Sequence, residues 1–297
     1  MTVITEENMF LAKRLFPGLA RSESGGDPAY YEEKYPARDL PDGAAVTRLG
    51  PSPTGFIHLG NLYTAIVNQK LANETGGIFL LRVEDTDSKR EMAGAVESLI
   101  ASLSHYGVVF DEGVMLDALV GGVVEQGGYG PYHQSARRDI YHTFAKRLVE
   151  EGKAYPCFLT EEEIDGIRIR QEAAKLTPGI YGQWAKYRSL TAAEYGQMLE
   201  RGLPYVLRFR APQEERRISV RDGIRGEVHA PGNTMDFVLL KSDGMPTYHF
   251  AHVVDDHLMR TTHVIRGEEW LSSLPVHVDL FEALGFELPI YCHSAVL

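Results

Sequence analysis

Residues 50–65, GPSPTGFIHLGNLYTA, place several turn-forming residues and one histidine directly before an apolar stretch with helical spacing. The stretch follows VTRL (46–49), a strand candidate, and leads into a helix predicted over His58–Thr75, which two glycines terminate. The next segment, IFLLRVE (78–84), is a nearly continuous apolar run, typical of a strand buried in a parallel sheet. Strand, loop, helix and strand in this order predict a right-handed βαβ unit.

The pattern beyond this unit changes twice along the chain. Helical spacing predicts two more helices, through Val96, Leu99, Ile100 and Leu103 and through Ile140, Phe144 and Leu148. Capping-box spacing at Thr160–Glu163 and Thr191–Glu194 predicts two short helices. After Pro204 the period becomes two, which predicts strands in YVLRFR (205–210), RISV (217–220) and MDFVLLK (235–241), with turns at Asp222-Gly223 and Asp243-Gly244. Apolar runs return from residue 247, and a helix is predicted near 275–284.

This order predicts an α/β fold split by an inserted α+β block. We expect an N-terminal extension over 1–45, the first half of the α/β fold over 46–141, the insertion over 142–246 and the second half of the fold over 247–297. The extension is rich in Pro, Gly and charge and lacks clean periodicity. We expect it to wrap on the surface of the back of the sheet or to be partly mobile.

Composition narrows the class of protein. The chain has 297 residues, 44% of them hydrophobic, and contains no apolar run of the roughly 18 residues that a membrane span needs. Its N-terminus is acidic where a secretory signal would be basic, and Cys157 and Cys292 are its only cysteines. These features predict a cytoplasmic protein without a disulfide framework or membrane partner. The net charge of −11 argues against attraction of the whole molecule to nucleic acid, but arginines cluster locally: Arg208, Arg210, Arg216, Arg217, Arg221 and Arg225.

The opening loop lacks both common phosphate-binding motifs, the P-loop and Gly-x-Gly-x-x-Gly. Its position still suits a nucleotide, because a helix that starts after the first parallel strand offers free N–H groups to phosphates. His58 there could donate a hydrogen bond to a phosphoryl oxygen, and Gly60 would let an adenine or ribose approach the backbone. A histidine that caps the helix and a glycine that permits tight packing explain the spacing equally well.

Four segments in order resemble the catalytic core of glutamyl-tRNA synthetase, a class I aminoacyl-tRNA synthetase. They are RLGPSPTGFIHLGNLYTA (48–65), LLRVEDTD (80–87), LLKSDGMPTYHFAHVVDDHLM (239–259) and HVIRGEEWLSS (263–273). The resemblance spans about 46–297. It implies a Rossmann-like nucleotide-binding fold with a parallel sheet, in which the inserted domain binds the acceptor end of tRNA.

The implied activity is that of a glutamate–tRNA ligase. The enzyme joins glutamate to ATP as glutamyl-adenylate, releases pyrophosphate and transfers the glutamyl group to the 2′-OH at the 3′ end of tRNA. The implied partners are L-glutamate, ATP and tRNA(Glu), and Mg²⁺ accompanies ATP, held mostly by phosphates and water. We expect a monomer.

The resemblance also implies site residues. His58 and Gly60 match the catalytic His-Ile-Gly-His element of the family, with Asn61 as a departure in its last position. The residues matched to ATP binding are Pro51, Thr54, His58, Gly60, Asn61 and Glu269. Those matched to glutamate binding are Arg48, Gly50, Ser52, Glu84, Tyr248, His252, Arg266 and Trp270.

Within the glutamate set, Arg48 and Arg266 would hold the side-chain carboxylate and Glu84 the α-ammonium group. His252 departs from the Asn or aliphatic residue of several relatives. Ordinary roles compete with these: Glu84 could pair with Arg82 or Lys89 on a surface, and Arg266 could form a structural ion pair.

Two more departures concern metal and length. Cys157 is present, but Leu159 stands where zinc-binding relatives carry a second cysteine, so we predict no structural zinc. The chain stops before the family's second, lysine-bearing loop, so we expect a fragment that binds its substrates weakly and catalyses poorly alone. Alternative hypotheses are a glutamyl-queuosine tRNA synthetase or a non-catalytic paralogue. A glutaminyl-tRNA synthetase fits less well, because its relatives carry Glu where Ser52 stands.

Overall fold

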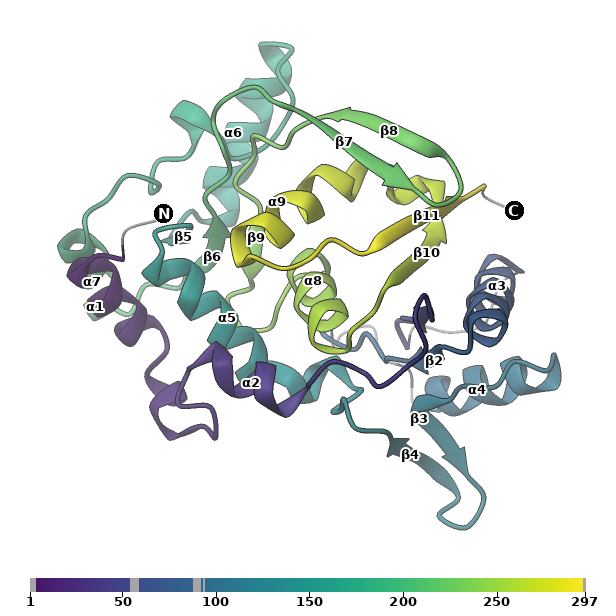
Figure 1. The fold of residues 1–297 in the computed structure, drawn as a ribbon. Coiled ribbons are helices and arrows are strands. Elements are labelled where there is room, and N and C mark those ends of the chain that lie inside the picture. Colours follow the sequence, from purple (N-terminus) through teal and green to yellow (C-terminus); the bar gives the residue numbers. More distant parts are fainter. Residues whose placement is uncertain (1–3, 54–58, 88–91, 93, 296–297) are drawn as a thin grey trace.

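The strands on either side of residues 50–65 belong to a mixed four-stranded sheet. The computed structural model describes residues 4–53, 59–87, 92 and 94–295. Strands β1 (Val46–Leu49), β2 (Ile78–Leu81) and β3 (Glu112–Asp117) pair in parallel, and β4 (Gly122–Gln126) adds an antiparallel edge. Helix α3 (Leu59–Thr75) joins β1 to β2, and α4 (Ala95–His105) joins β2 to β3 (Figure 1). The predicted βαβ unit is therefore confirmed.

The parallel arrangement continues with two strands from the other end of the chain. Strands β10 (His263–Gly267) and β11 (Ile290–Ser294) pair in parallel, with α9 (Leu274–Leu284) between them in sequence. Strand β10 adjoins β1, because the Thr262 N–H donates to the Val46 carbonyl at 3.0 Å. Strands β1–β4 and strands β10 and β11 thus build one layer, and the carboxyl ends of β1 and β2 lie at the same edge of it.

The segment between these two parts has its own sheets. Helix α5 (Arg138–Glu150) leads into an antiparallel sheet of β5 (Ala154–Cys157), β6 (Val206–Phe209) and β9 (Val238–Leu240). The predicted capping boxes open α6 (Glu161–Ala173) and α7 (Ala192–Glu200). Strands β7 (Arg217–Asp222) and β8 (Gly226–Pro231) form a hairpin that lies over α9 and beside β11 (Figure 1). Helix α8 (Tyr248–Leu258) follows. The domain boundaries at 45, 141 and 246 stay predictions.

Two predicted features differ in detail. The strand predicted over 78–84 ends at Leu81, and Val83 instead forms an isolated bridge with His133. The extension is not an irregular surface segment, because α1 (Glu6–Leu15) and α2 (Pro28–Lys34) occupy part of it and α1 packs against α5 and α7. Its prolines and glycines lie mostly outside these helices, while its apolar residues supply part of the largest hydrophobic core: Leu11, Ala12, Leu15, Phe16, Leu19, Tyr31 and Tyr35.

The core position of α1 predicts a large cost for truncating its buried leucine. Leu11 is 3% exposed, so Leu11→Ala should lower the free energy of unfolding by about 2–5 kcal/mol, measured by urea denaturation. Phe10→Ala on the same helix is the control, because Phe10 is 54% exposed and should lose less than about 1 kcal/mol. Equal losses in the two variants would show that α1 does not belong to the core.

Within the described residues, no helix is both long enough and apolar enough to cross a membrane.

Candidate active site

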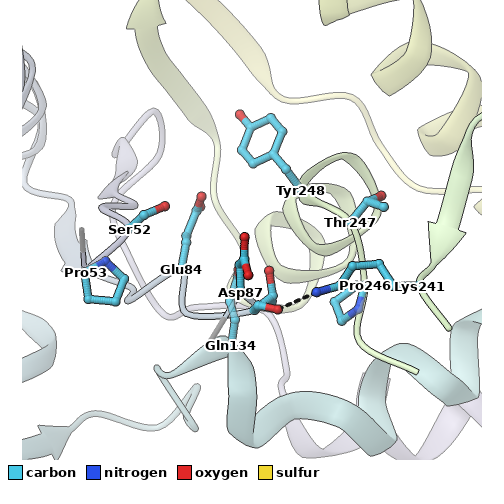
Figure 2. Close-up of a pocket in the computed structure, with 10 residues that line it drawn as sticks. Ser52, Pro53, Glu84, Asp87, Gln134, Lys241, Pro246, Thr247 and Tyr248 are labelled. Carbon is cyan, nitrogen blue, oxygen red and sulfur yellow. Dashed lines mark hydrogen bonds between the residues drawn. The ribbon is translucent and has the colours of Figure 1, made fainter. Parts of the chain in front are cut away.

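A cavity of about 350 Å³ lies where the loops after β1 and β2 meet the start of α8. Figure 2 shows Ser52, Pro53 and Glu84 on one side of it, opposite Lys241, Pro246 and Thr247. Tyr248, Gln134, Thr86 and Asp87 complete the lining. Three of the residues predicted for glutamate, Ser52, Glu84 and Tyr248, therefore converge on one cavity.

Glu84 is one of the two acidic residues that line this cavity, the other being Asp87. Its carboxylate accepts a hydrogen bond from Arg82 Nη2 at 3.0 Å, and its backbone N–H donates to the Pro51 carbonyl at 2.9 Å. A Cβ atom at Gly50 would lie 2.9 Å from the carboxyl carbon of Glu84. A side chain at position 50 would therefore displace the Glu84 carboxylate. Burial raises the pKa of Glu84 despite the charges of Arg82 and Arg48. Glu84 thus pairs with Arg82, but inside the protein rather than on a surface.

Two arginines that act on Glu84, Arg82 and Arg48, are held by Asp256 of α8. Asp256 accepts from Arg82 Nη1 at 2.6 Å and from Arg48 Nε at 3.1 Å. All three side chains are buried, and the two arginines hold the pKa of Asp256 well below its ordinary value against the effect of burial. The guanidinium of Arg48 therefore already has a carboxylate partner, and its positive charge also lowers the pKa of Glu84 against the effect of burial.

Arg266, on β10, has a different environment. Its Nε donates to His293 Nε2 at 3.0 Å, Nη1 lies 3.2 Å from His277 Nδ1, and Nη2 donates to the Trp270 carbonyl at 3.4 Å. Burial lowers the pKa of both histidines, so these acceptors are neutral at pH 7. Among the residues that the structure describes, no carboxylate is a direct partner of Arg266. A buried guanidinium without a counter-charge can bind an anionic ligand group.

Tyr248 links this arginine to the cavity. Its ring lies 4.6 Å from that of Trp270 and stacks on His252 at 5.7 Å, and both Arg266 and Glu84 affect its pKa. Burial raises that pKa, so the Tyr248 hydroxyl keeps its proton at neutral pH. The lining of the cavity therefore includes two carboxylates, those of Glu84 and Asp87, and the Tyr248 hydroxyl, and Tyr248 lies next to the guanidinium of Arg266.

The family model described as tRNA synthetases class I (E and Q), catalytic domain, matches residues 44–297. The chain belongs to this family. It is 51% identical to the glutamate–tRNA ligase of Clostridium perfringens (strain 13) over 95% of this chain and 50% of the relative. It is 53% identical to that of Acetivibrio thermocellus over 97% of this chain and 51% of the relative. The chain thus spans about half the length of these curated relatives.

Solved structures agree with this assignment of the fold. The glutamate-tRNA synthetase of Elizabethkingia anophelis is 42% identical, with a TM-score of 0.75, and the match covers 86% of this chain and 50% of that one. A glutamate tRNA ligase of Elizabethkingia meningosepticum, solved in complex with its amino acid, also has a TM-score of 0.75, over 85% of this chain and 49% of that one. The predicted class I synthetase fold, with its parallel strands, is therefore confirmed.

The predicted ATP residues of this synthetase domain are placed less completely. Thr54 and His58 lie outside the described residues. Gly60 and Asn61 lie in the first turn of α3, Pro51 is held by Glu84, and Glu269 lies in the 3-10 helix Glu268–Ser273. Of these described residues, none is among the residues that line the cavity. Their roles stay predictions.

His252 is enclosed within the synthetase domain. Its Nδ1 lies 2.9 Å from the Asp256 carboxylate and its Nε2 lies 2.9 Å from the Tyr291 hydroxyl. These contacts fit an imidazole that donates from Nδ1 and accepts at Nε2. A hydrogen bond between His252 and a ligand would require one of these two bonds to break, so its predicted role in binding glutamate stays a prediction.

Burial of His252 predicts acid-dependent stability. Burial lowers its pKa to about 3, against 6.5 for an ordinary histidine, and Arg48 and Arg266 add to the effect while Asp256 opposes it. Below pH 6.5 the His252 imidazole therefore becomes protonated in the unfolded chain but stays neutral in the folded protein. The free energy of unfolding consequently falls as the pH drops from 6.5 toward 3. In the His252→Asn variant the asparagine can still donate to Asp256 but does not titrate. Between pH 7 and pH 5 its free energy of unfolding, measured by urea denaturation, should therefore fall by about 2 kcal/mol less than that of the wild type. Equal losses would contradict the assigned neutral state.

Several residues that line the cavity were not predicted from the sequence. Lys241 donates to the Thr86 carbonyl at 2.7 Å, drawn as the dashed line in Figure 2. Lys241, Thr86 and Asp87 all lie in segments that carry the family resemblance, which could have indicated them. Gln134 lies outside those segments. Within the described residues, no group of three or more His, Cys, Asp or Glu side chains is placed to hold a metal ion.

Proposed function

We propose that this protein is a glutamate–tRNA ligase, which activates L-glutamate with ATP and transfers it to the 3′ end of tRNA(Glu). The single observation that carries the proposal is that the cavity presents the Glu84 carboxylate, while the buried Arg266 next to Tyr248 has no direct carboxylate partner among the described residues. Glutamate has an ammonium group for the first and a side-chain carboxylate for the second. The names of the relatives, at about half identity, favour this function over the two alternative hypotheses.

The proposed chemistry needs no nucleophile from the protein. One oxygen of the α-carboxylate of glutamate attacks the α-phosphorus of ATP, and the bond to pyrophosphate breaks. The ribose hydroxyl of the tRNA terminus then attacks the carbonyl carbon of the adenylate, and AMP leaves. The protein contributes positioning and charge. Glu84 would orient the α-ammonium group, Arg266 and Arg48 the side-chain carboxylate, and Tyr248 and Ser52 would contact the amino acid.

The nucleotide side of the proposal depends on the start of α3. His58 and Gly60 would contact the phosphates and ribose of ATP, together with the other residues matched to the family. Mg²⁺ would enter with ATP and shield the charge of its phosphates. The described residues offer it no preformed cluster of ligands, so phosphate oxygens and water would supply most of its coordination.

The proposed tRNA contact lies on the β7–β8 hairpin. Four of the six clustered arginines have partners within the protein. Two donate to backbone carbonyls, Arg208 to that of Asp236 and Arg210 to that of Arg188. The other two pair with carboxylates, Arg216 with Asp279 and Arg225 with Glu268. Arg217 and Arg221 instead face solvent, alternating with the buried Ile218 and Val220. These two exposed cations would bind phosphates of the acceptor end despite the acidic net charge of the chain. Cytoplasmic location and a monomeric state stay predictions.

The proposal is tested by ATP–pyrophosphate exchange in the complete protein with tRNA(Glu) present. Exchange should depend on L-glutamate and should be far slower with L-glutamine or L-aspartate at equal concentration. A preference for glutamine or aspartate, or exchange without any of the three, would overturn the proposed specificity.

A further inference from the structure

Asp222, at the end of β7, is a buried carboxylate that holds one histidine. Its Oδ2 lies 2.6 Å from His293 Nδ1 and accepts from the His293 backbone N–H at 3.1 Å. Its Oδ1 accepts from the backbone N–H groups of Ile224 and Arg225, both at 2.9 Å. Asp222 is 3% exposed and His293 is fully buried, so water does not compete for these contacts. The hairpin turn thus fixes the carboxylate, and the carboxylate fixes the imidazole.

The contact with Asp222 decides which nitrogen of His293 carries the proton. A carboxylate only accepts hydrogen bonds, so the neutral imidazole must carry its proton on Nδ1. Its Nε2 is then a lone-pair acceptor, and it receives the Nε–H of Arg266 at 3.0 Å. Arg266 and His293 are direct partners in the β10–β11 register, which places their side chains on one face of the sheet. The guanidinium of Arg266 also lies 4.6 Å from the Tyr291 ring.

We infer that Asp222 and His293 are positioning residues that orient Arg266, and that they thereby set the preference of the site for a carboxylate over a neutral amide. This inference rests on the proposed function, in which Arg266 reads the side-chain carboxylate of glutamate. Asp222 fixes the orientation of the His293 imidazole through Nδ1, and the Nε2 atom that then accepts from Arg266 belongs to a neutral ring. The guanidinium therefore keeps its positive charge for the ligand while its Nε edge is fixed.

The same geometry joins the inserted hairpin to the amino-acid site. Asp222 belongs to the β7–β8 hairpin, whereas His293 and Arg266 belong to the parallel strands β11 and β10. Arg225, in the turn of the hairpin, also donates to the His293 carbonyl at 3.0 Å. Specificity for the amino acid therefore depends on a residue outside the parallel strands that carry Arg48 and Arg266.

The test replaces Asp222 with asparagine, which has the same shape. The amide oxygen can still accept from Ile224 and Arg225, but the amide NH₂ would face His293 Nδ1 and donate to it. The imidazole must then carry its proton on Nε2, directly against the Arg266 Nε–H. Asp279→Asn is the matched control, because Asp279 is also a buried carboxylate but pairs with Arg216 and Asn233 instead of His293.

Equilibrium binding of L-glutamate and of L-glutamine is measured by calorimetry for the wild type and both variants. We expect Asp222→Asn to weaken glutamate binding at least tenfold and glutamine binding less than threefold, while Asp279→Asn leaves the ratio of the two affinities unchanged. Equal weakening of both ligands by Asp222→Asn would show a merely structural role and overturn the inference. No preference for glutamate in the wild type would instead overturn the proposed function.

A second pair of variants covers the case in which Asp222→Asn does not fold. Gln at position 293 can offer an amide oxygen to Arg266, whereas Leu cannot. His293→Gln should therefore retain more of the preference for glutamate than His293→Leu, by at least threefold in the affinity ratio. The same ratio in both variants would contradict the assigned acceptor role of His293.

Discussion

Replacing Arg266 with glutamine is expected to weaken the binding of L-glutamate by roughly 100-fold, which corresponds to about 3 kcal/mol. The side chain of the substituted glutamine is neutral, so the side-chain carboxylate of bound L-glutamate would enter a buried region without a positive charge to pair with. The charge of Arg48 does not replace that of Arg266, because Asp256 already pairs with Arg48. Calorimetric titration of both proteins with L-glutamate at neutral pH measures the change.

Arg216→Gln serves as the control for this variant. Arg216 makes ion pairs with Asp279 and Glu282 away from the cavity, so its loss should change the glutamate affinity less than twofold. An Arg266→Gln protein that folds and binds glutamate within threefold of the wild type would remove Arg266 from the site.

Replacing Asp255 with alanine should cost about 3–5 kcal/mol of unfolding free energy. This fully buried carboxylate accepts from Arg137 Nε at 2.7 Å and from the Tyr141 hydroxyl and Gln134 Nε2, both at 2.8 Å. Without it, the buried guanidinium of Arg137 loses its carboxylate partner and keeps the carbonyls of Tyr129 and Pro131. Urea denaturation at neutral pH measures the loss.

Glu200→Ala provides the comparison on the surface. Its ion pair with Arg14 is solvent-exposed on the Glu200 side, and such pairs contribute about 0–1 kcal/mol. If Asp255→Ala lost no more stability than Glu200→Ala, the buried network would not stabilise α8.

Local patterns predicted most of the elements around the site. The apolar run before Gly76, the capping boxes at Thr160 and Thr191 and the period-two segments each report the structure of a few neighbouring residues, and the elements form there. The convergence of Ser52 and Glu84 was also accessible, because both follow parallel strands that end at one edge of the sheet. Tyr248, at the start of α8, follows no parallel strand, and only the family resemblance indicated it.

Long-range pairing was not accessible in the same way. Arg82, Arg137 and Asp255 read as ordinary charged residues in the sequence, and only the fold shows that each is buried against a partner far along the chain. The hairpin that brings Asp222 to His293 joins residues 71 positions apart. The packing of α1 on α5 was hidden for the same reason, since the local composition of the extension resembles that of a loop.

A crystal structure of the protein with L-glutamate tests the central claim most directly. We predict that the side-chain carboxylate of the ligand contacts the Arg266 guanidinium and that its α-ammonium group contacts the Glu84 carboxylate, with the ligand against Tyr248. A ligand whose carboxylate lies away from Arg266, or whose ammonium group lies away from Glu84, would contradict the account.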